Sequence, residues 1–134
     1  MKINIFDGFW TVDDVKQNTD ILFIYGDNDK KTGKKGQAII RNETNAIGIP
    51  TKKYPSMKKD AFYNDDEYEM NKIKINTAIE LIYIKLKTGK YKSIYMPENN
   101  FGTGLAQLEI HAPKTFKYLN KQIEKMIDNI ENNY

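Results

Sequence analysis

Residues 21–50 constrain the fold of this chain more than any other segment. An apolar run, residues 21–25, ends in Gly26-Asp27-Asn28, and a loop with two further glycines follows. Residues 37–41 are compatible with a short helix, and a second apolar run ends at Pro50. This order predicts a strand, a glycine-rich loop, a short helix and a strand. Ligands of open α/β sheets bind where strands end and such loops begin, so the segment predicts both a fold class and the place of a site.

A second glycine-rich loop, residues 98–104, follows another apolar run at residues 93–96. Glycines allow phosphate oxygens to approach the backbone N–H groups closely, so two such loops after two strands predict a phosphate or nucleotide pocket. We expect residues 26–37 and 98–104 to line one shared cavity at the carboxyl edge of the sheet. The expected ligand-binding residues are Gly26, Asp27, Asn28, Gly33, Gly36, Gln37, Thr51, Gly102, Thr103 and Gly104.

The remaining chain alternates between strand and helix patterns, which predicts one α/β domain over residues 1–134 with a mixed sheet and helices on both faces. Residues 2–6 alternate as a strand does, and Thr11 with Asp14 resembles a capping box before a helix at residues 12–18. A long helix capped by Asp65 or Asp66 is expected to run to about Lys87, and Pro113 is expected at the first position of the last helix. The long helix has an apolar stripe at Ile75, Ala78, Ile79, Ile82 and Leu86, widened by Leu81.

Composition excludes several classes of protein. The net charge is +3, and Arg41 is the only arginine among 21 basic residues. Arginine supplies the forked contact that reads guanine, so sequence-specific recognition of nucleic acid is disfavoured. The chain has no cysteine, which rules out disulfides and thiolate metal sites. No apolar run approaches the roughly 18 residues of a membrane span. We expect no metal, no cofactor and no membrane, and a cytoplasmic location.

Several of these residues have two interpretations. Asp27 and Asn28 either form a tight turn or point into a crevice to bind a base, a ribose or a water molecule. Glu98 is either a general base or a solvated loop charge. His111, the only histidine, is either catalytic or a structural hydrogen-bonding group. Asp27, Glu98 and His111 are therefore the catalytic candidates if the protein is an enzyme. The glycine-rich loops are either anion cradles or ordinary surface loops.

Taken together, five pieces of the chain resemble a known family. They are FIYGDN (residues 23–28), GKKGQAIIR (33–41), AIGIPTK (46–52), MPENNFGTGLAQL (96–108) and HAPKTFKYL (111–119). This set is similar to small uncharacterised proteins of bacteriophages and bacteria that are distantly related to macro domains. The resemblance implies a three-layer α/β/α sandwich that binds ADP-ribose at the carboxyl ends of its strands. It implies a ribose contact for Asn28 and diphosphate contacts for both glycine-rich loops.

The chain also departs from the macro-domain pattern. Its first loop lacks the usual glycine triplet, and Asp7 and Asp20 are the candidates for the aspartate that reads adenine. The expected function is binding of a phosphate-bearing, nucleotide-derived ligand such as ADP-ribose or a related NAD product. A phage factor that interferes with nucleotide signalling in the cytoplasm of a bacterial host is the expected setting. The alternatives are a hydrolase of an ADP-ribosyl or related bond, and a domain that binds a host protein and whose glycine loops are purely structural.

Overall fold

A computed structural model of the chain describes residues 1–6, 8, 10–98 and 101–134. Four strands form one sheet in the order β1-β4-β2-β3, and every neighbouring pair is parallel. The strands are β1 (Lys2–Phe6), β2 (Ile21–Asn28), β3 (Ala46–Lys52) and β4 (Ser93–Pro97). Antiparallel pairing among the described residues is confined to an isolated bridge between Lys52 and Phe62.

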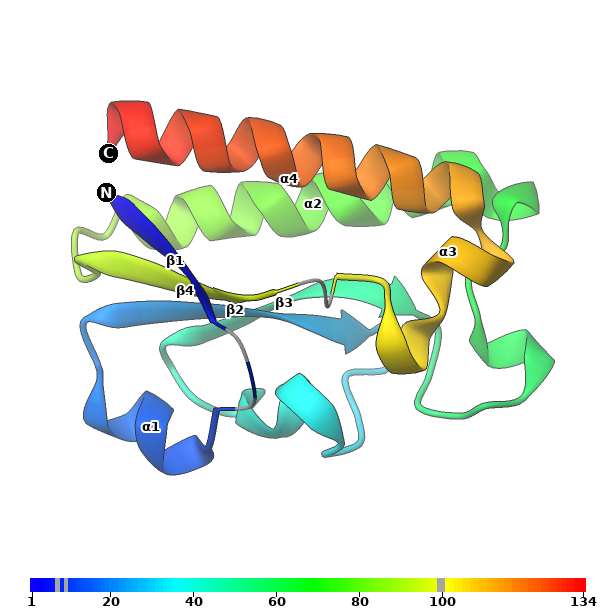
Figure 1. Cartoon of the computed structure of the whole chain (residues 1–134), viewed down its shortest axis with the longest axis horizontal. Coiled ribbons are helices and arrows are strands. Elements are labelled where there is room, and N and C mark those ends of the chain that lie inside the picture. Colours follow the sequence, from blue (N-terminus) through cyan, green and yellow to red (C-terminus); the bar gives the residue numbers. More distant parts are fainter. Residues whose placement is uncertain (7, 9, 99–100) are drawn as a thin grey trace.

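Helices cover both faces of the sheet (Figure 1). The long helices α2 (Tyr68–Leu86) and α4 (Pro113–Asn133) lie side by side on one face. The short helix α1 (Val12–Gln17) and the 3₁₀-helix η1 (Gly36–Ile40) lie on the other, and α3 (Leu108–His111) lies beyond the carboxyl ends of the strands. The remaining 3₁₀-helices are η2 (Lys59–Ala61), η3 (Asp65–Glu67) and η4 (Gly104–Ala106). The predicted α/β class and the three layers are confirmed, whereas the sheet, predicted as mixed, pairs its described strands in parallel only.

The first glycine motif lies inside a strand, which corrects the predicted strand end at residue 25. β2 continues through Gly26 and Asp27 to Asn28, paired with β3 and interrupted by a bulge between Asp27 and Asn28. The turn follows at Asn28, whose carbonyl accepts a hydrogen bond from the N–H of Lys31 (3.1 Å). A parallel ladder with a neighbouring strand therefore outweighs the turn preference of Gly, Asp and Asn, since strand formation depends strongly on context.

The local helix signals are confirmed. The Thr11 hydroxyl accepts from the N–H of Asp14 (3.1 Å), and the Asp14 carboxylate accepts from the N–H of Thr11 (2.8 Å), which is a complete capping box. α4 begins at Pro113. The stripe of α2 is buried at Ile75, Ala78, Ile82 and Leu86, but Leu81 is exposed, so its predicted place in this stripe is wrong. Residues 65–67, predicted as the start of the long helix, form η3.

Two apolar cores lie on the two faces of the sheet. β2 contributes to both, because Leu22 and Ile24 face α2 and α4, whereas Phe23 and Tyr25 face α1 and η1. A parallel strand buried on both sides reads as a continuous apolar run, which explains the pattern of residues 21–25. On the second face Trp10 packs edge-on against Phe23 with ring centroids 5.3 Å apart.

Candidate functional site

The chain leaves the neighbouring strands β2 and β4 in opposite directions at their carboxyl ends. The chain leaves β2 towards η1 on one face, whereas it leaves β4 towards α4 on the other (Figure 1). The pairing of the two strands runs from Ile21 with Ser93 to Phe23 with Tyr95, so β2 extends well beyond its ladder with β4. Neighbouring strands whose connections leave to opposite faces define a topological switch point, where open α/β sheets bind ligands.

Asp27 is held by Arg41. The Nε atom of Arg41 donates to both carboxylate oxygens (3.1 Å each), and Nη2 donates to Oδ1 (2.6 Å). The side chain of Asp27 is only 6% exposed and that of Arg41 only 13%. Asp27 raises the pKa of Arg41, and burial together with Asp27 raises the pKa of Tyr25, whose hydroxyl donates to the carboxylate (3.4 Å). Arg41 also donates to the carbonyl of Thr32 (3.0 Å), so the pair ties the first glycine-rich loop to β2.

Asn28 closes the same loop. Its Nδ2 donates to the carbonyl of Thr32 (2.8 Å), and its Oδ1 accepts from the N–H of Thr32 (3.4 Å). Both ends of the amide are thus used within the chain, which favours the turn interpretation. Gly33 follows with a φ of +84°, and a Cβ there would lie 3.1 Å from the Cβ of Pro55. The ribose contact expected of Asn28 stays a prediction.

Gln37 is buried at the start of η1. Its Nε2 donates to the carbonyl of Gly8 (3.1 Å), and its own carbonyl accepts from the indole N–H of Trp10 (3.4 Å). The side-chain oxygen of Gln37 is buried and accepts no hydrogen bond within the described part of the chain. η1 is a 3₁₀-helix of five residues, which is too short to provide the anion-binding helix terminus expected after Gly33 and Gly36.

Lys52, the last residue of β3, is the residue at this edge of the sheet whose charge is least compensated by its neighbours. It is 7% exposed, and within the described ranges no carboxylate lies within 4.0 Å of its ammonium. The Nζ atom donates to the carbonyl of Leu105 (3.1 Å), directly after the second glycine-rich loop, and lies 4.7 Å from the centroid of the Phe62 ring. Burial lowers the pKa of this ammonium from its usual value of 10.5. Lys52 is therefore a desolvated cation whose ammonium contacts the Leu105 carbonyl, the Met57 sulfur (3.6 Å) and the Phe62 ring, but no carboxylate among the described residues.

An aromatic pair lies beside Lys52, and its two rings line a cavity to which Lys52 itself does not contribute. The ring of His111 stacks on Phe62 with centroids 4.0 Å apart and planes 16° apart, and His111 Nε2 lies 3.2 Å from Oε1 of Gln107. Both rings line a cavity of about 470 Å³. The other lining residues are Lys53, Lys59, Asp60, Tyr63 and Asn64. Its volume is in the range that small-molecule sites occupy.

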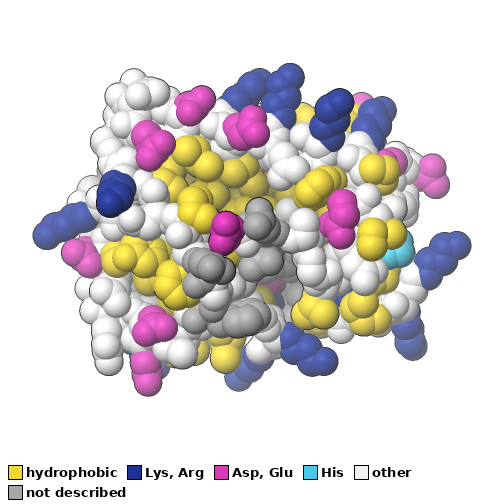
Figure 2. Space-filling view, in the orientation of Figure 1, with side chains coloured by type: hydrophobic (Ala, Val, Ile, Leu, Met, Phe, Trp, Pro, Cys, Tyr) yellow, Lys and Arg dark blue, Asp and Glu magenta, His cyan; other side chains and the backbone are white. Residues whose placement is uncertain are grey.

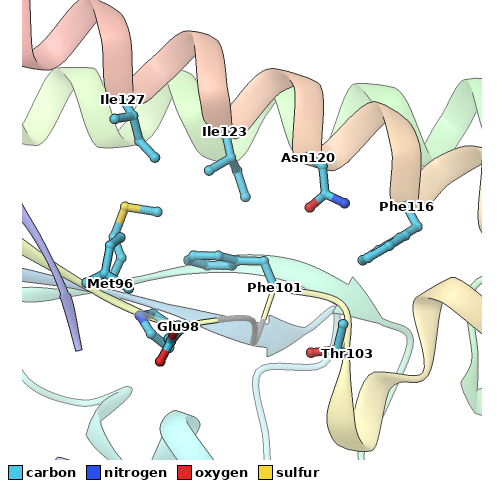
Figure 3. Close-up of a pocket in the computed structure, with 10 residues that line it drawn as sticks. Met96, Glu98, Phe101, Thr103, Phe116, Asn120, Ile123 and Ile127 are labelled. Carbon is cyan, nitrogen blue, oxygen red and sulfur yellow. The ribbon is translucent and has the colours of Figure 1, made fainter. Parts of the chain in front are cut away.

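Glu98 and Thr103 line a different cavity, of about 340 Å³, between α4 and the end of β4. Figure 3 shows Ile123 and Ile127 of α4 pointing towards Met96 and Phe101, whereas the carboxylate of Glu98 points away from these apolar groups. Hydrophobic side chains gather at this place on the surface, below α4 (Figure 2). Neither of these two cavities is lined by both glycine-rich loops, so the expected shared cavity is not one of them. Asp7 lies outside the described residues.

Two glycines of the second loop, Gly102 and Gly104, differ in their surroundings, which gives a matched pair of variants. A Cβ on Gly102 would lie 2.7 Å from Cδ2 and 2.9 Å from Cβ of the buried Leu108, whereas a Cβ on Gly104 would meet nothing within 4 Å. Both residues have a positive φ (+85° and +63°). Gly102→Ala should lower the free energy of unfolding by about 2 kcal/mol through backbone strain and overpacking, and Gly104→Ala by about 1 kcal/mol through strain alone. Urea denaturation measures both, and equal losses would contradict the packing of Gly102 against Leu108.

Comparison with known protein families identifies the family of this chain. The model of a family of unknown function, DUF7831, matches residues 5–122. The chain belongs to this family. The match includes β2, β3, β4, the end of β1 and all residues that line the cavity at Phe62 and His111, and it confirms the predicted membership in an uncharacterised family. A search of curated proteins and a search of solved structures gave no match.

The structure brings together residues of this DUF7831 member that its sequence did not single out. Arg41 holds Asp27 across 14 positions, and Lys52 reaches Leu105 across 53. Lysine is abundant in this chain, so the sequence does not distinguish Lys52 from the exposed lysines. Its position in a strand, next to Thr51, is the one feature of the sequence that could indicate its burial. Thr51 itself is buried, and its hydroxyl donates to the carbonyl of Asp27 (3.4 Å).

Across the described ranges no three acidic or histidine side chains gather as metal ligands, and no helix is long and apolar enough to cross a membrane.

Proposed function

We propose that this protein binds a phosphate-bearing, nucleotide-derived ligand, such as ADP-ribose or a related NAD product, at the carboxyl edge of the sheet. The observation that carries the proposal is the ammonium of Lys52, which is desolvated and has no carboxylate partner among the described residues. A buried charge is costly unless it is paired, so an anionic group that binds here gains a charge-assisted hydrogen bond and removes that cost.

The neighbourhood of Lys52 supports a phosphate as the anion. The carbonyl that Lys52 contacts belongs to Leu105, next to Gly104. Gly104 has a positive φ and open space on the side where a Cβ would lie. A ligand oxygen can therefore approach the backbone of this loop and the ammonium together. Gly102, Thr103 and Gly104 keep the phosphate role expected from the sequence, and Lys52 joins them.

The cavity lined by Phe62 and His111 supports a ligand larger than a phosphate ion. Its lining combines these two aromatic rings with Lys59 and with Lys53, which is paired with Glu67 (2.6 Å), and it also includes Asp60. Aromatic faces are platforms for stacking of a base, and lysines near them favour an acidic ligand. A nucleotide with its phosphate at Lys52 and its base in this cavity fits both features.

The hydrolase alternative has weaker support. Both carboxylate oxygens of Asp27 accept hydrogen bonds from Arg41, which offsets the charge of Asp27. Glu98 lines a different cavity from His111. His111 is the remaining candidate, and its ring is occupied by stacking on Phe62 and by contact with Gln107. A general base has to reach the attacking water, and no pair of these candidates shares one cavity. We therefore favour binding without turnover. The phage setting expected from the sequence remains part of this proposal.

Titration calorimetry with ADP-ribose, ADP, inorganic pyrophosphate and adenosine tests the proposal. The three phosphate-bearing compounds should bind, with affinities that fall as salt is raised because ion pairing is screened. Adenosine, which lacks the anion, should bind at least tenfold more weakly than ADP. Equal affinity for ADP and adenosine, or no binding of any compound, would overturn the proposal. Mass spectrometry of ADP-ribose after long incubation separates sequestration from hydrolysis, and a cleaved product would favour the enzyme.

A further inference from the structure

Helix α2 carries a second apolar stripe on its outer side. Met70, Ile73, Leu81 and Ile84 are 53%, 58%, 47% and 59% exposed, and the exposed Thr77 lies between them. Their spacing of three, four, four and three residues places them in one line along the helix. The stripe covers 14 residue steps, which is about 21 Å of helix. We call these five residues the outer stripe.

The outer stripe is unrelated to the core that α2 shares with the sheet. The buried stripe of this helix, at Ile75, Ala78, Ile82 and Leu86, lies on the opposite side. α4 contacts a flank between the two, where Tyr118 donates to Asn76 (2.6 Å) and Asn129 donates to Tyr83 (3.0 Å). A helix that is apolar on two opposite sides is typical of one packed between two partners, and a continuous exposed apolar surface marks an interaction site.

We propose that the outer stripe is the interface of a homodimer, in which α2 packs antiparallel to the α2 of a second copy of the chain. The residue spacing is symmetric about Thr77, because Ile73 and Leu81 lie four positions on either side and Met70 and Ile84 lie seven. A twofold axis at Thr77 therefore places Met70 against the partner's Ile84 and Ile73 against the partner's Leu81. Such self-complementarity is what an interface with twofold symmetry requires.

The charges at the two ends of α2 agree with the antiparallel direction. The amino end carries Asp66, Glu67 and Glu69, and the carboxyl end carries Lys85, Lys87 and Lys90. Antiparallel packing places Glu69 near the partner's Lys87, whereas parallel packing would place like charges together. Glu69 is 81% exposed, and its contact within the chain is a surface pair with Lys72 (3.0 Å). Like charges across an interface are unfavourable, so the ends select the antiparallel pair.

The size of the stripe predicts a reversible dimer. Stable protein interfaces bury roughly 800 Å² on each partner, and two helices touching over about 21 Å bury less than that. We expect a dissociation constant on the order of 10 µM, visible as a rise in mass with concentration in analytical ultracentrifugation. Ile73→Glu should weaken the dimer at least tenfold. Ile110→Glu changes a residue that is 65% exposed on α3, outside the stripe, and should leave the dimer unchanged. A monomer at all concentrations, or equal effects of both variants, would overturn the proposal.

Cysteine cross-linking tests the direction of packing, and the absence of native cysteines makes the result direct. Thr77→Cys lies on the proposed axis, within reach of its counterpart, and should give a disulfide-linked dimer under mild oxidation. Met70→Cys should not link to itself, because its counterpart lies about 21 Å away. An equimolar mixture of Met70→Cys and Ile84→Cys should form the mixed dimer. Efficient self-linking of Met70→Cys would contradict the antiparallel arrangement.

Discussion

Arg41→Met is expected to lower the free energy of unfolding by about 3 kcal/mol, the typical cost of removing one partner from a buried ion pair. The variant would leave the carboxylate of Asp27, which is 6% exposed, without the guanidinium that contacts both of its oxygens. It would also remove the donor to the carbonyl of Thr32, so the first glycine-rich loop would lose its link to β2. Chemical denaturation followed by circular dichroism measures the loss.

Two further variants isolate the cause of this loss. Arg41→Lys keeps the charge but not the fork, and should lose an intermediate amount because lysine cannot contact both oxygens in the same plane. Asp27→Asn combined with Arg41→Met removes the stranded charge and should recover at least about 1 kcal/mol relative to Arg41→Met alone. If Arg41→Met stays within about 0.5 kcal/mol of the unchanged protein, as surface substitutions do, the pair is not a structural element.

Lys52→Met should change stability and binding in opposite directions. Affinity for ADP-ribose should fall about a hundredfold, in the range observed when one partner of a buried charged contact is removed. The free protein should become more stable by about 1 kcal/mol, because the variant no longer buries a charge without a counter-ion. Lys125→Met, on the exposed face of α4, is the matched control and should change neither quantity. A destabilised Lys52→Met with unchanged affinity would assign the lysine a purely structural role.

The pH dependence of stability gives an independent signature of Lys52. Its folded-state pKa is lowered from 10.5, so between the lowered value and 10.5 the unfolded chain binds more protons than the folded one. Stability should therefore rise with pH through this window as the cost of burying the charge disappears. Lys52→Met should lack this rise relative to the unchanged protein. Thermal unfolding of both proteins from pH 7 to 10.5 measures the difference.

Local signals in the sequence predicted the elements that depend on neighbouring residues. The capping box at Thr11, the helix start at Pro113 and the buried stripe of α2 follow from spacings of three or four residues, and all are present. The end of β2 was predicted too early, because the ladder with β3 comes from a segment about 20 residues later. Gly26, Asp27 and Asn28 have turn preferences that this pairing overrides.

The candidate site was predicted less completely than the fold, since its contacts join distant parts of the chain. The sequence identified the glycine-rich loops and the edge of the sheet where they lie. It did not identify the pairing of Asp27 with Arg41, nor the environment of Lys52, because the burial of one lysine among many depends on tertiary packing. The stacking of Phe62 on His111 spans 49 positions and has no local signal.

The environment of Trp10 has a practical consequence for experiments on this protein. Trp10 is the only tryptophan, it is 3% exposed, and its indole N–H is bound to the carbonyl of Gln37 in η1. Its fluorescence therefore comes from one place, at the point where η1 packs beneath the sheet. Detachment of η1 would admit water to the indole and shift the emission to longer wavelength, while the cores on the other face stay intact. Recorded beside far-UV circular dichroism, which reports mainly on α2 and α4, this label-free signal distinguishes local detachment of η1 from global unfolding, because only global unfolding changes both.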